Sequence, residues 1–474
     1  MSLPESLDAA PLVDLTRRAL AEDGAEVWIA GGAVRDAALG REVTDLDLAV
    51  AGDPERAAKA VAREGDGHAF ELSAEFATWR AVARDRSWQV DATALRGETI
   101  EADLAARDFT LGAVAAPLGG GDPIDPFGGL GDLERRLLRA VAEDSFRADP
   151  LRLLRAARLA ADLGLTVDPG TVALARSEAK LAAEAAGERQ LAELRQMIGG
   201  PDPMRGLVLL DELGLTPVVL PELEALRGVE QGPNHHLDVH GHTLAVLEQT
   251  LEVESDLTRF AGERAADTRD LLDEPLTDEM SRGTALRFGA LLHDIGKPAT
   301  RGERDGYVTF IGHDSVGAEI VAGICCRLRA SSRLSRHLQG LTLHHLRLGF
   351  MVHEAPLPPR RVHEYLRATA PVAADVTLLT VADRLSARGT GPFATEEAIE
   401  AHLSLARQML AAALDWRRDG PPEPLIRGDE LAAGLGIAPG PELGDLLTEI
   451  EAAQYAGEVS TREQALERAR RLRG

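Results

Sequence analysis

The sequence predicts an α+β protein with a mixed amino-terminal part followed by helices alone. Apolar runs with strand character alternate with helical patterns up to about residue 130, whereas from Asp132 onward only helical spacing recurs. The length of 474 residues is enough for about three domains. From the changes in composition along the chain we expect domains at residues 1–135, 136–230, 231–400 and 401–474.

In the amino-terminal part the order strand–helix–strand–helix–strand–strand is predicted. The apolar run Val27–Ala30 is broken by two glycines, and the helical pattern that follows stops at Gly40. Asp53 followed by Pro54 is typical of a helix start, with an N-cap and then proline at the first helical position. The four predicted strands are residues 27–30, 44–50, 78–83 and 89–93.

In the helical part, apolar spacing typical of helices covers residues 149–161 and 188–198. Proline and glycine then punctuate residues 217–233, which indicates a domain boundary there. A second helical block is expected from about His235 to Gly391.

The charge is large and unevenly distributed. A net charge of −25 argues against a nucleic-acid partner, because phosphate binding depends on Lys and Arg. Residues 248–279 hold eleven acids and three arginines, which predicts an exposed insertion or a partly ordered loop. Arginines gather instead at residues 135–158 and 327–347. We therefore expect any RNA contact to be confined to a narrow arginine-lined face and to be sensitive to salt.

The cysteine pattern and the hydropathy indicate a cytoplasmic protein. Cys325 and Cys326 are adjacent and cannot cross-link a fold, which is typical of a reducing compartment. The first residues lack the basic and apolar regions of a signal peptide, and no apolar stretch reaches the ~18 residues of a membrane span. We expect no membrane partner.

A group of acids and glycines near the amino terminus suits phosphoryl chemistry. Asp45 and Asp47 lie two apart on a predicted strand, so both carboxylates share a face, and Asp91 lies on another strand. Such carboxylates can hold Mg²⁺ for in-line phosphoryl transfer. Gly31–Gly32 lets the backbone approach a phosphate, with Arg35 one turn into the helix. Taken singly, the acids could be ordinary surface residues and the glycines a turn.

Together these residues form part of an ordered series of motifs. The segments are Gly31–Asp36, Leu39–Gly40, Asp45–Asp47, Asp103–Thr110, Asp125–Leu133 and Phe146–Arg152. The series resembles the signature of class II tRNA nucleotidyltransferases and bacterial poly(A) polymerases, and the resemblance covers roughly residues 27–223. It implies a head of DNA polymerase beta-like fold, followed by an all-α neck that binds RNA and nucleotide.

The resemblance also implies a role for each motif residue. Asp45, Asp47 and Asp91 would be catalytic, with Mg²⁺ on the first two. Asp149 and Arg152 would pair with the incoming base, although Asp149 before Pro150 is equally a good N-cap from the residues alone. The nucleotide-binding residues would be Gly31, Gly32, Arg35, Arg107, Asp108, Asp149, Arg152, Arg155 and Arg158. For Arg155 and Arg158 a surface position is the alternative.

The chain departs from the family pattern at three positions. Ala106, Gly112 and Ala148 stand where the family usually has Arg, Asn and Glu. The segment between Asp91 and Arg107 is also shorter than in enzymes that add the whole CCA end. It is more similar to that of members that add only CC or only A.

A second group of metal-ligating residue types follows the neck. His242, His293, Asp294 and Asp383 occur in the order His, His-Asp, Asp, and nine of the thirteen histidines lie within residues 235–345. Imidazole and carboxylate together bind divalent metals that activate water. The pattern resembles the HD phosphohydrolase domain found after the neck in many bacterial members of the same family. The identity of its metal is left open. Further candidates for a second metal position are His313 and the adjacent pair His344–His345, of which His344 is the one preferred.

The leading hypothesis is template-independent addition of C, A or both to the 3′ end of tRNA, with CTP, ATP and Mg²⁺. One alternative is a metal-dependent HD phosphohydrolase acting on RNA or nucleotide phosphate ends, and another is a poly(A) polymerase. The non-enzymatic alternative is an RNA-binding protein in which both sites are silent.

Overall fold

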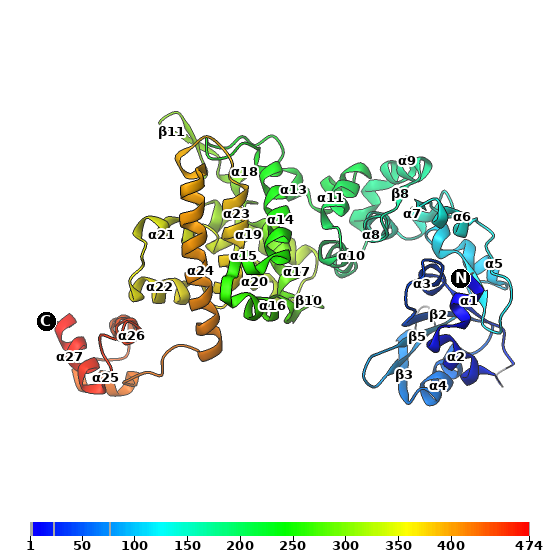
Figure 1. Ribbon diagram of the computed structural model, residues 1–474, viewed down its shortest axis with the longest axis horizontal. Coiled ribbons are helices and arrows are strands. Elements are labelled where there is room, and N and C mark those ends of the chain that lie inside the picture. The colour runs from blue at the N-terminus through cyan, green and yellow to red at the C-terminus, as the bar shows by residue number, and fades with distance from the viewer. Residues whose placement is uncertain (1–2, 22–23, 75–76, 474) are drawn as a thin grey trace. The chain divides into compact units, whose positions relative to one another are not determined.

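The computed structural model describes residues 3–21, 24–74 and 77–473 (Figure 1). The chain forms two compact units. One comprises residues 1–197 and 201–219, and the other comprises residues 198–200 and 220–474. The α+β class predicted from the sequence is confirmed, since the large sheet lies in the first unit and helices dominate elsewhere.

The first unit is built on a six-stranded sheet in the order β3-β4-β5-β2-β1-β6. Strands β2 and β5 are parallel, and the other neighbours are antiparallel. All four predicted strands are present, and β3 and β6 were not predicted. Edge strand β3 exposes most of its side chains, so it lacks the apolar alternation that marks a half-buried strand. The strands are β1 (Val27–Ala30), β2 (Asp45–Val50), β3 (Gly67–Ser73), β4 (Thr78–Ala83), β5 (Gln89–Ala94) and β6 (Ala115–Pro117).

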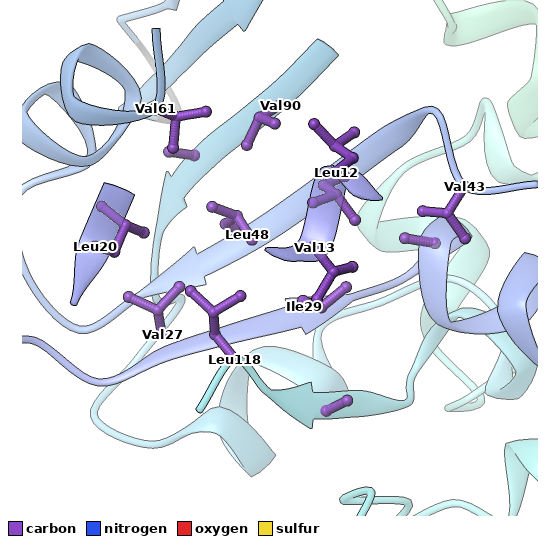
Figure 2. Packing of buried hydrophobic residues seen from close by; sticks show 14 of the residues in the cluster. Leu12, Val13, Leu20, Val27, Ile29, Val43, Leu48, Val61, Val90 and Leu118 are labelled. Atoms are coloured by element: carbon purple, nitrogen blue, oxygen red, sulfur yellow. The ribbon is translucent and has the colours of Figure 1, made fainter. Parts of the chain in front are cut away.

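Successive side chains of β2 point to opposite faces of the sheet, so its apolar residues and its aspartates lie on different faces. Leu46 and Leu48 are buried on the face that α2 (Pro11–Leu20) and α4 (Pro54–Glu64) cover, whereas Asp45 and Asp47 lie on the opposite face. Figure 2 shows this core, with Leu48 among side chains from the neighbouring strands and from both helices. The predicted start of α4 is confirmed, because the Asp53 side chain accepts hydrogen bonds from the first turn.

Short helices complete the first unit. Asp149 does not cap α8, which begins at Arg152 and has Leu151 in the N-cap position. A two-stranded pair, β7 (Leu137–Leu138) and β8 (Thr166–Val167), lies within this helical part. The remaining helices are α1 (Leu3–Asp8), α3 (Gly32–Ala38), α5 (Ile100–Ala105), η1 (Thr110–Gly112), α6 (Gly129–Glu134), α7 (Ser145–Ala148), α8 (Arg152–Leu163), α9 (Pro169–Glu178), η2 (Ala179–Glu184), α10 (Gly187–Gly199), α11 (Pro203–Glu212) and α12 (Thr216–Val219).

The second unit is helical, with two small hairpins, β9–β10 and β11–β12. The long α24 crosses it (Figure 1). Its helices up to α24 are α13 (Pro221–Glu224), α14 (Val239–Ser255), α15 (Leu257–Ala261), η3 (Gly262–Arg264), α16 (Ala265–Asp273), α17 (Arg282–Leu292), α18 (Lys297–Thr300), α19 (His313–Arg327), α20 (Ser332–His344), α21 (Arg347–Met351), η4 (Val352–Glu354), α22 (Pro359–Thr369), α23 (Ala373–Ser386), η5 (Pro392–Ala394) and α24 (Glu396–Asp419). The strands are β9 (Pro275–Thr277), β10 (Met280–Ser281), β11 (Gly302–Arg304) and β12 (Tyr307–Thr309).

The acidic segment 248–279 is ordered, so the prediction of an exposed insertion or loop was wrong. It forms the end of α14, then α15, η3, α16 and β9. Phe260, Leu271 and Leu272 within it are buried. The acids lie between apolar residues at helical spacing, and helical packing of those residues outweighs the local charge.

The chain ends in three helices with a core of their own, α25 (Gly428–Leu435), α26 (Pro441–Tyr455) and α27 (Arg462–Arg473). Among the residues that the structure describes, no helix combines the length and the hydropathy needed to cross a bilayer.

Candidate functional site

The first site lies on the open face of the sheet, where β2 presents Asp45 and Asp47. Gly31 directly follows β1 and has a φ of +72°, a conformation that favours glycine. A Cβ at this position would lie 2.7 Å from Arg107 Nη1 and 3.2 Å from Asp47 Oδ2. Glycine at residue 31 therefore allows the Asp47 carboxylate and the Arg107 guanidinium to approach the same turn.

The electrostatics of the two carboxylates Asp45 and Asp47 favour a bound cation. Desolvation raises the pKa of Asp47, and the neighbouring charges of Asp91 and Asp45 raise it further, against the opposing effect of Arg107. Desolvation likewise raises the pKa of Asp45. Two carboxylates that resist ionisation side by side are relieved by a divalent cation, and their oxygens are suitable hard ligands. The residues present thus fit a divalent metal.

Asp91 lies beside this pair but is bound to Arg80. Its two carboxylate oxygens accept hydrogen bonds of 2.7 Å from Arg80 Nε and Nη2, a bidentate ion pair between β5 and β4. Among the described residues, Asp45, Asp47 and Asp91 do not form a group whose ligand atoms all lie within 4.8 Å of one another. The role of Asp91 as a third catalytic carboxylate stays a prediction.

Two of the predicted nucleotide-binding residues, Arg35 and Arg107, are held by acids nearby. Arg35 donates from Nε and Nη2 to Asp36, both at 2.9 Å. Arg107 donates to Asp103 at 3.1 and 3.2 Å and to the Gly112 carbonyl at 3.3 Å. These contacts fix both guanidiniums close to the glycine turn.

Asp108 and Arg155 join the sheet-bearing part to α8. Burial raises the pKa of Asp108, but the charge of Arg155 and the hydrogen bond from the Phe109 amide outweigh it, so the net pKa is lowered. Arg155 Nε donates to Asp108 at 2.9 Å. The carboxylate is therefore ionised and already has a cation partner.

The side chains of Asp149 and Arg152 are held by different partners. Arg152 donates to the carbonyls of Ala106 and Arg107 and to Ser145 Oγ, at 2.7, 3.2 and 3.0 Å. Asp149 accepts from the Leu151 amide at 3.1 Å and from Arg189 at 2.9 and 3.3 Å. The two side chains are held independently on the same segment, which leaves each able to offer hydrogen bonds to a ligand.

The arginine stripe is largely paired within the protein. Arg158 donates to Glu193 at 2.6 Å and to Asp162 at 3.2 Å. Arg135 and Arg139 both bind Asp132. Much of the positive charge expected to meet RNA in this stripe is thus balanced internally.

The second unit holds two adjacent groups of metal-ligating residues. His242, His293 and Asp383 form one group, and each offers a ligand atom within 4.8 Å of the others. His242 Nε2 lies 3.0 Å from Asp383 Oδ1. Burial raises the pKa of Asp383, but the hydrogen bond and charge of His242 hold it well below its usual range.

Asp294 links this group to the second one, which it forms with His313 and His345. Asp294 Oδ2 lies 3.2 Å from His293 Nε2, and Asp294 Oδ1 lies 3.3 Å from His313 Nε2 and 3.6 Å from His345 Nε2. Asp294 would contribute to both sites if each group held a divalent cation. Its neighbour Lys297 lies 2.6 Å from Oδ2.

Three of the histidines are held in one orientation by the backbone. The Nδ1 atoms of His293, His313 and His345 lie 2.8, 2.7 and 2.6 Å from the carbonyl oxygens of Ala290, Phe310 and Thr342 respectively. A carbonyl only accepts, so each Nδ1 carries the proton, and in the neutral ring each Nε2 presents a lone pair to the centre.

An unsatisfied buried atom is a second sign that the histidine–aspartate site of the second unit fits a divalent metal. His293 Nε2 is buried and makes no hydrogen bond. Such an atom is costly without a partner, and a cation would supply one. Of the predicted pair His344–His345, His345 belongs to the second group and His344 belongs to neither.

Three family models match the chain. The model described as "Poly A polymerase head domain" matches residues 27–139, and that of the "HD domain" matches residues 239–388. Residues 164–226 match "Probable RNA and SrmB- binding site of polymerase A". The order of the three matches is the order predicted from the motifs.

Curated relatives match over nearly the whole chain. The "A-adding tRNA nucleotidyltransferase" of Deinococcus radiodurans is 37% identical over 444 residues, covering 92% of this chain and 93% of the relative. The chain belongs to the tRNA nucleotidyltransferase family. The "CC-adding tRNA nucleotidyltransferase" of Thermus thermophilus is 35% identical, covering 92% of the enzyme and 91% of that relative.

Solved structures agree on the fold. "The complex structure of CCA-adding enzyme with CTP" has a TM-score of 0.65 at 19% identity, covering 100% of the enzyme and 98% of that chain. "Thermotoga maritima CCA-adding enzyme complexed with tRNA_CCA" has a TM-score of 0.61 at 19% identity, covering 100% and 99%.

Three residues outside the sequence motifs bind residues that were predicted to belong to the site. Arg80 holds Asp91, Arg189 holds Asp149, and Glu193 holds Arg158. Arg189 and Glu193 lie four residues apart on α10, a spacing that places them on one helix face and was visible in the sequence. No local signal marks Arg80, because only strand pairing brings it beside Asp91.

Proposed function

We propose that the enzyme adds C or A to the 3′ end of tRNA, using CTP or ATP and Mg²⁺. The observation that carries this proposal is the arrangement around the Gly31 turn. Two carboxylates with raised pKa values lie beside a guanidinium there, on the open face of the sheet. The names of the relatives and the ligands in the titles of the similar structures support the substrate classes.

Different residues of the chain have different roles in nucleotide transfer. Asp45 and Asp47 would hold Mg²⁺, which when bound would lower the pKa of the attacking 3′-hydroxyl and offset the charge of the triphosphate. Arg35 balances the phosphate charge, and Arg107 orients the ribose. Asp149 and Arg152 select the base, because a mismatched base leaves buried donors and acceptors unpaired.

We further propose that the enzyme adds either CC or A, and not the complete CCA end. Support comes from the segment between β5 and Arg107, which is short and helical. The Thr99 side chain caps α5, Ile100 and Leu104 are buried, and Asp103 binds Arg107. An ordered, packed segment of this kind lacks the longer flexible stretch associated with the switch from C to A.

The experiment offers tRNA transcripts that lack CCA, CA or A, together with each nucleoside triphosphate in turn and Mg²⁺. We expect incorporation of C alone on the first two transcripts, or of A alone on the third. Completion of CCA on the first transcript would contradict the single specificity, and long A tails would favour a poly(A) polymerase.

We propose a second function, metal-dependent phosphoester hydrolysis in the second unit. The bridging position of Asp294 between two groups of ligands supports it. A pair of bound divalent cations would supply an activated water and neutralise a phosphate. Lys297 is positioned by Asp294, Gln231 and the Phe310 ring, and its ammonium can balance a further phosphate charge.

This second activity is measured on RNA ending in a 2′,3′-cyclic phosphate, as opening of the ring to a phosphomonoester, and on RNA ending in a 2′-phosphate, as release of inorganic phosphate. Mg²⁺, Mn²⁺, Co²⁺ or Ni²⁺ is added singly. We expect turnover with at least one metal and none in its absence. Lack of turnover with all four metals, in a preparation that incorporates nucleotides, would contradict the hydrolase proposal alone.

A further inference from the structure

The open face of the sheet carries two parallel rows of side chains that run from the carboxylate pair to the outer edge strand. Strand register places Asp47 opposite Asp91, Asp91 opposite Arg80, and Arg80 opposite Phe70. Directly opposed residues in neighbouring strands point to the same face. Phe70 therefore lies on the face of Asp47, three strands away.

The second row has the same form. Asp45 is opposite Gln89, Gln89 is opposite Val82, and Val82 is opposite His68. His68 and Phe70 thus occupy on β3 the positions that Asp45 and Asp47 occupy on β2. The core lies on the other face, where Ala69 packs against it.

The aromatic pair is open to solvent. The His68 and Phe70 rings stack, with centroids 6.0 Å apart and planes inclined by 26°. Phe70 is 42% exposed, and Leu72 beside it is 45% exposed. Exposed aromatic side chains on a sheet face are well suited to stack against unpaired nucleic-acid bases, since every base has a π face.

We propose that His68 and Phe70 form a stacking surface for unpaired bases of the RNA 3′ end, upstream of the reacting nucleotide. The proposal rests on the proposed nucleotidyl transfer and deepens it. The occupant is RNA because the surface continues directly into the proposed transfer site along both rows.

The geometry sets which nucleotides reach the surface. Three inter-strand spacings of about 4.8 Å separate β2 from β3, a distance of about 14 Å. At about 3.4 Å per stacked base, this distance corresponds to about four bases, or fewer in an extended strand. The terminal nucleotide at Asp47 cannot touch Phe70, whereas bases a few positions upstream can.

The test uses the full-length enzyme with Phe70→Ala, His68→Ala and the double variant. Phe70→Trp keeps a stacking ring, and Leu72→Ala removes exposed apolar area of similar size without removing a ring. Steady-state kcat and KM are measured on RNA primers with unpaired 3′ ends of one to five nucleotides. Thermal melting and gel filtration check folding and oligomeric state.

We expect Phe70→Ala to raise KM for primers with long unpaired ends by about fivefold to tenfold. KM for primers with a single unpaired nucleotide, KM for the nucleoside triphosphate, and kcat stay unchanged. Phe70→Trp keeps the wild-type KM for RNA, and Leu72→Ala leaves this KM unchanged.

Three results would overturn the proposal. KM for RNA could be unaffected at every primer length, Leu72→Ala could raise it as much as Phe70→Ala, or the variants could change only the oligomeric state. The last result would assign the patch on β3 to a protein partner.

A binding readout separates this inference from failure of the transfer reaction. 2-Aminopurine is placed three nucleotides from the 3′ end of a primer, where stacking quenches its fluorescence. Wild-type enzyme is expected to quench it, and Phe70→Ala to relieve the quenching, with or without turnover. Equal quenching by both proteins would contradict the stacking surface even if nucleotides are incorporated.

Discussion

Arg189 on α10 donates two hydrogen bonds to Asp149, at 2.9 and 3.3 Å, and so fixes the carboxylate proposed to select the base. Asp149 precedes α8, and Ala148 before it carries no carboxylate. Asp149 is therefore the acid in this segment, and it is oriented by Arg189, which lies on another helix and outside the motif.

Arg189→Ala should weaken base selection. A hydrogen bond between charged groups contributes about 1.5 kcal/mol, so we expect the ratio of kcat/KM between the preferred and the rejected nucleotide to fall about tenfold. Arg189→Lys should recover part of the ratio, because it keeps the charge without the fork. The ratio is measured with CTP and ATP on one primer. A fall in both kcat/KM values with an unchanged ratio would show that Arg189 only supports the fold.

Asp47→Asn should abolish transfer and leave the fold intact. The substitution removes a negatively charged ligand from the pair, and we expect incorporation to fall by about 10³-fold. Asp85→Asn, in the exposed turn between β4 and β5, is the matched control and should keep full activity. Incorporation of labelled nucleotide is measured beside thermal melting. Strong incorporation by Asp47→Asn would contradict the metal assignment.

Asp91→Asn should have a smaller effect than Asp47→Asn. Because both Asp91 oxygens are engaged by Arg80, the change mainly alters the charge beside the pair, and we expect about a tenfold loss of kcat. The same assay applies over a range of Mg²⁺ concentrations. A loss as large as that of Asp47→Asn would instead make Asp91 a ligand.

His345→Ala should remove metal from the second unit without affecting nucleotide addition. His345 belongs to the group around Asp294, whereas its neighbour His344 does not, so His344→Ala is the control. Bound metal per chain is measured by elemental analysis after reconstitution, and phosphate release is assayed separately. Equal metal loss in both variants would contradict the assignment of His345.

Asp132 should make the stability of the first unit depend on pH below about 4. Burial raises the pKa of Asp132, but hydrogen bonds from Thr110, Arg135 and Arg139 outweigh it and lower the net pKa. The unfolded chain has the ordinary Asp pKa of about 3.9, so the stabilisation is complete above that pH and is lost as pH falls through the lower folded pKa.

Asp132→Asn should remove that dependence and cost about 2 kcal/mol at neutral pH, since the buried partners lose a charged acceptor. Thermal melting of both proteins between pH 2.5 and 7 measures the difference. If the melting temperatures of the two proteins changed with pH by the same amount across that range, the role of Asp132 would be contradicted.

Local patterns predicted the parts of both sites that depend on neighbours in the chain. The alternation from Asp45 to Val50 placed the acids opposite the apolar residues, because successive strand residues point to opposite faces. The His-Asp pair at 293–294 likewise marked the second unit. Edge strand β3, the ordered acidic segment and the choice of His345 over His344 were not predicted, since each depends on what packs against the residue.

The sequence alone therefore determined the class of the fold, the order of the motifs and the face on which Asp45 and Asp47 lie. Only the tertiary structure decided that Arg80 binds Asp91, that Arg189 binds Asp149 and that His68 and Phe70 share the face of the carboxylates. The reason is that side-chain alternation is a property of neighbouring residues, whereas strand register and helix docking join residues far apart in the chain.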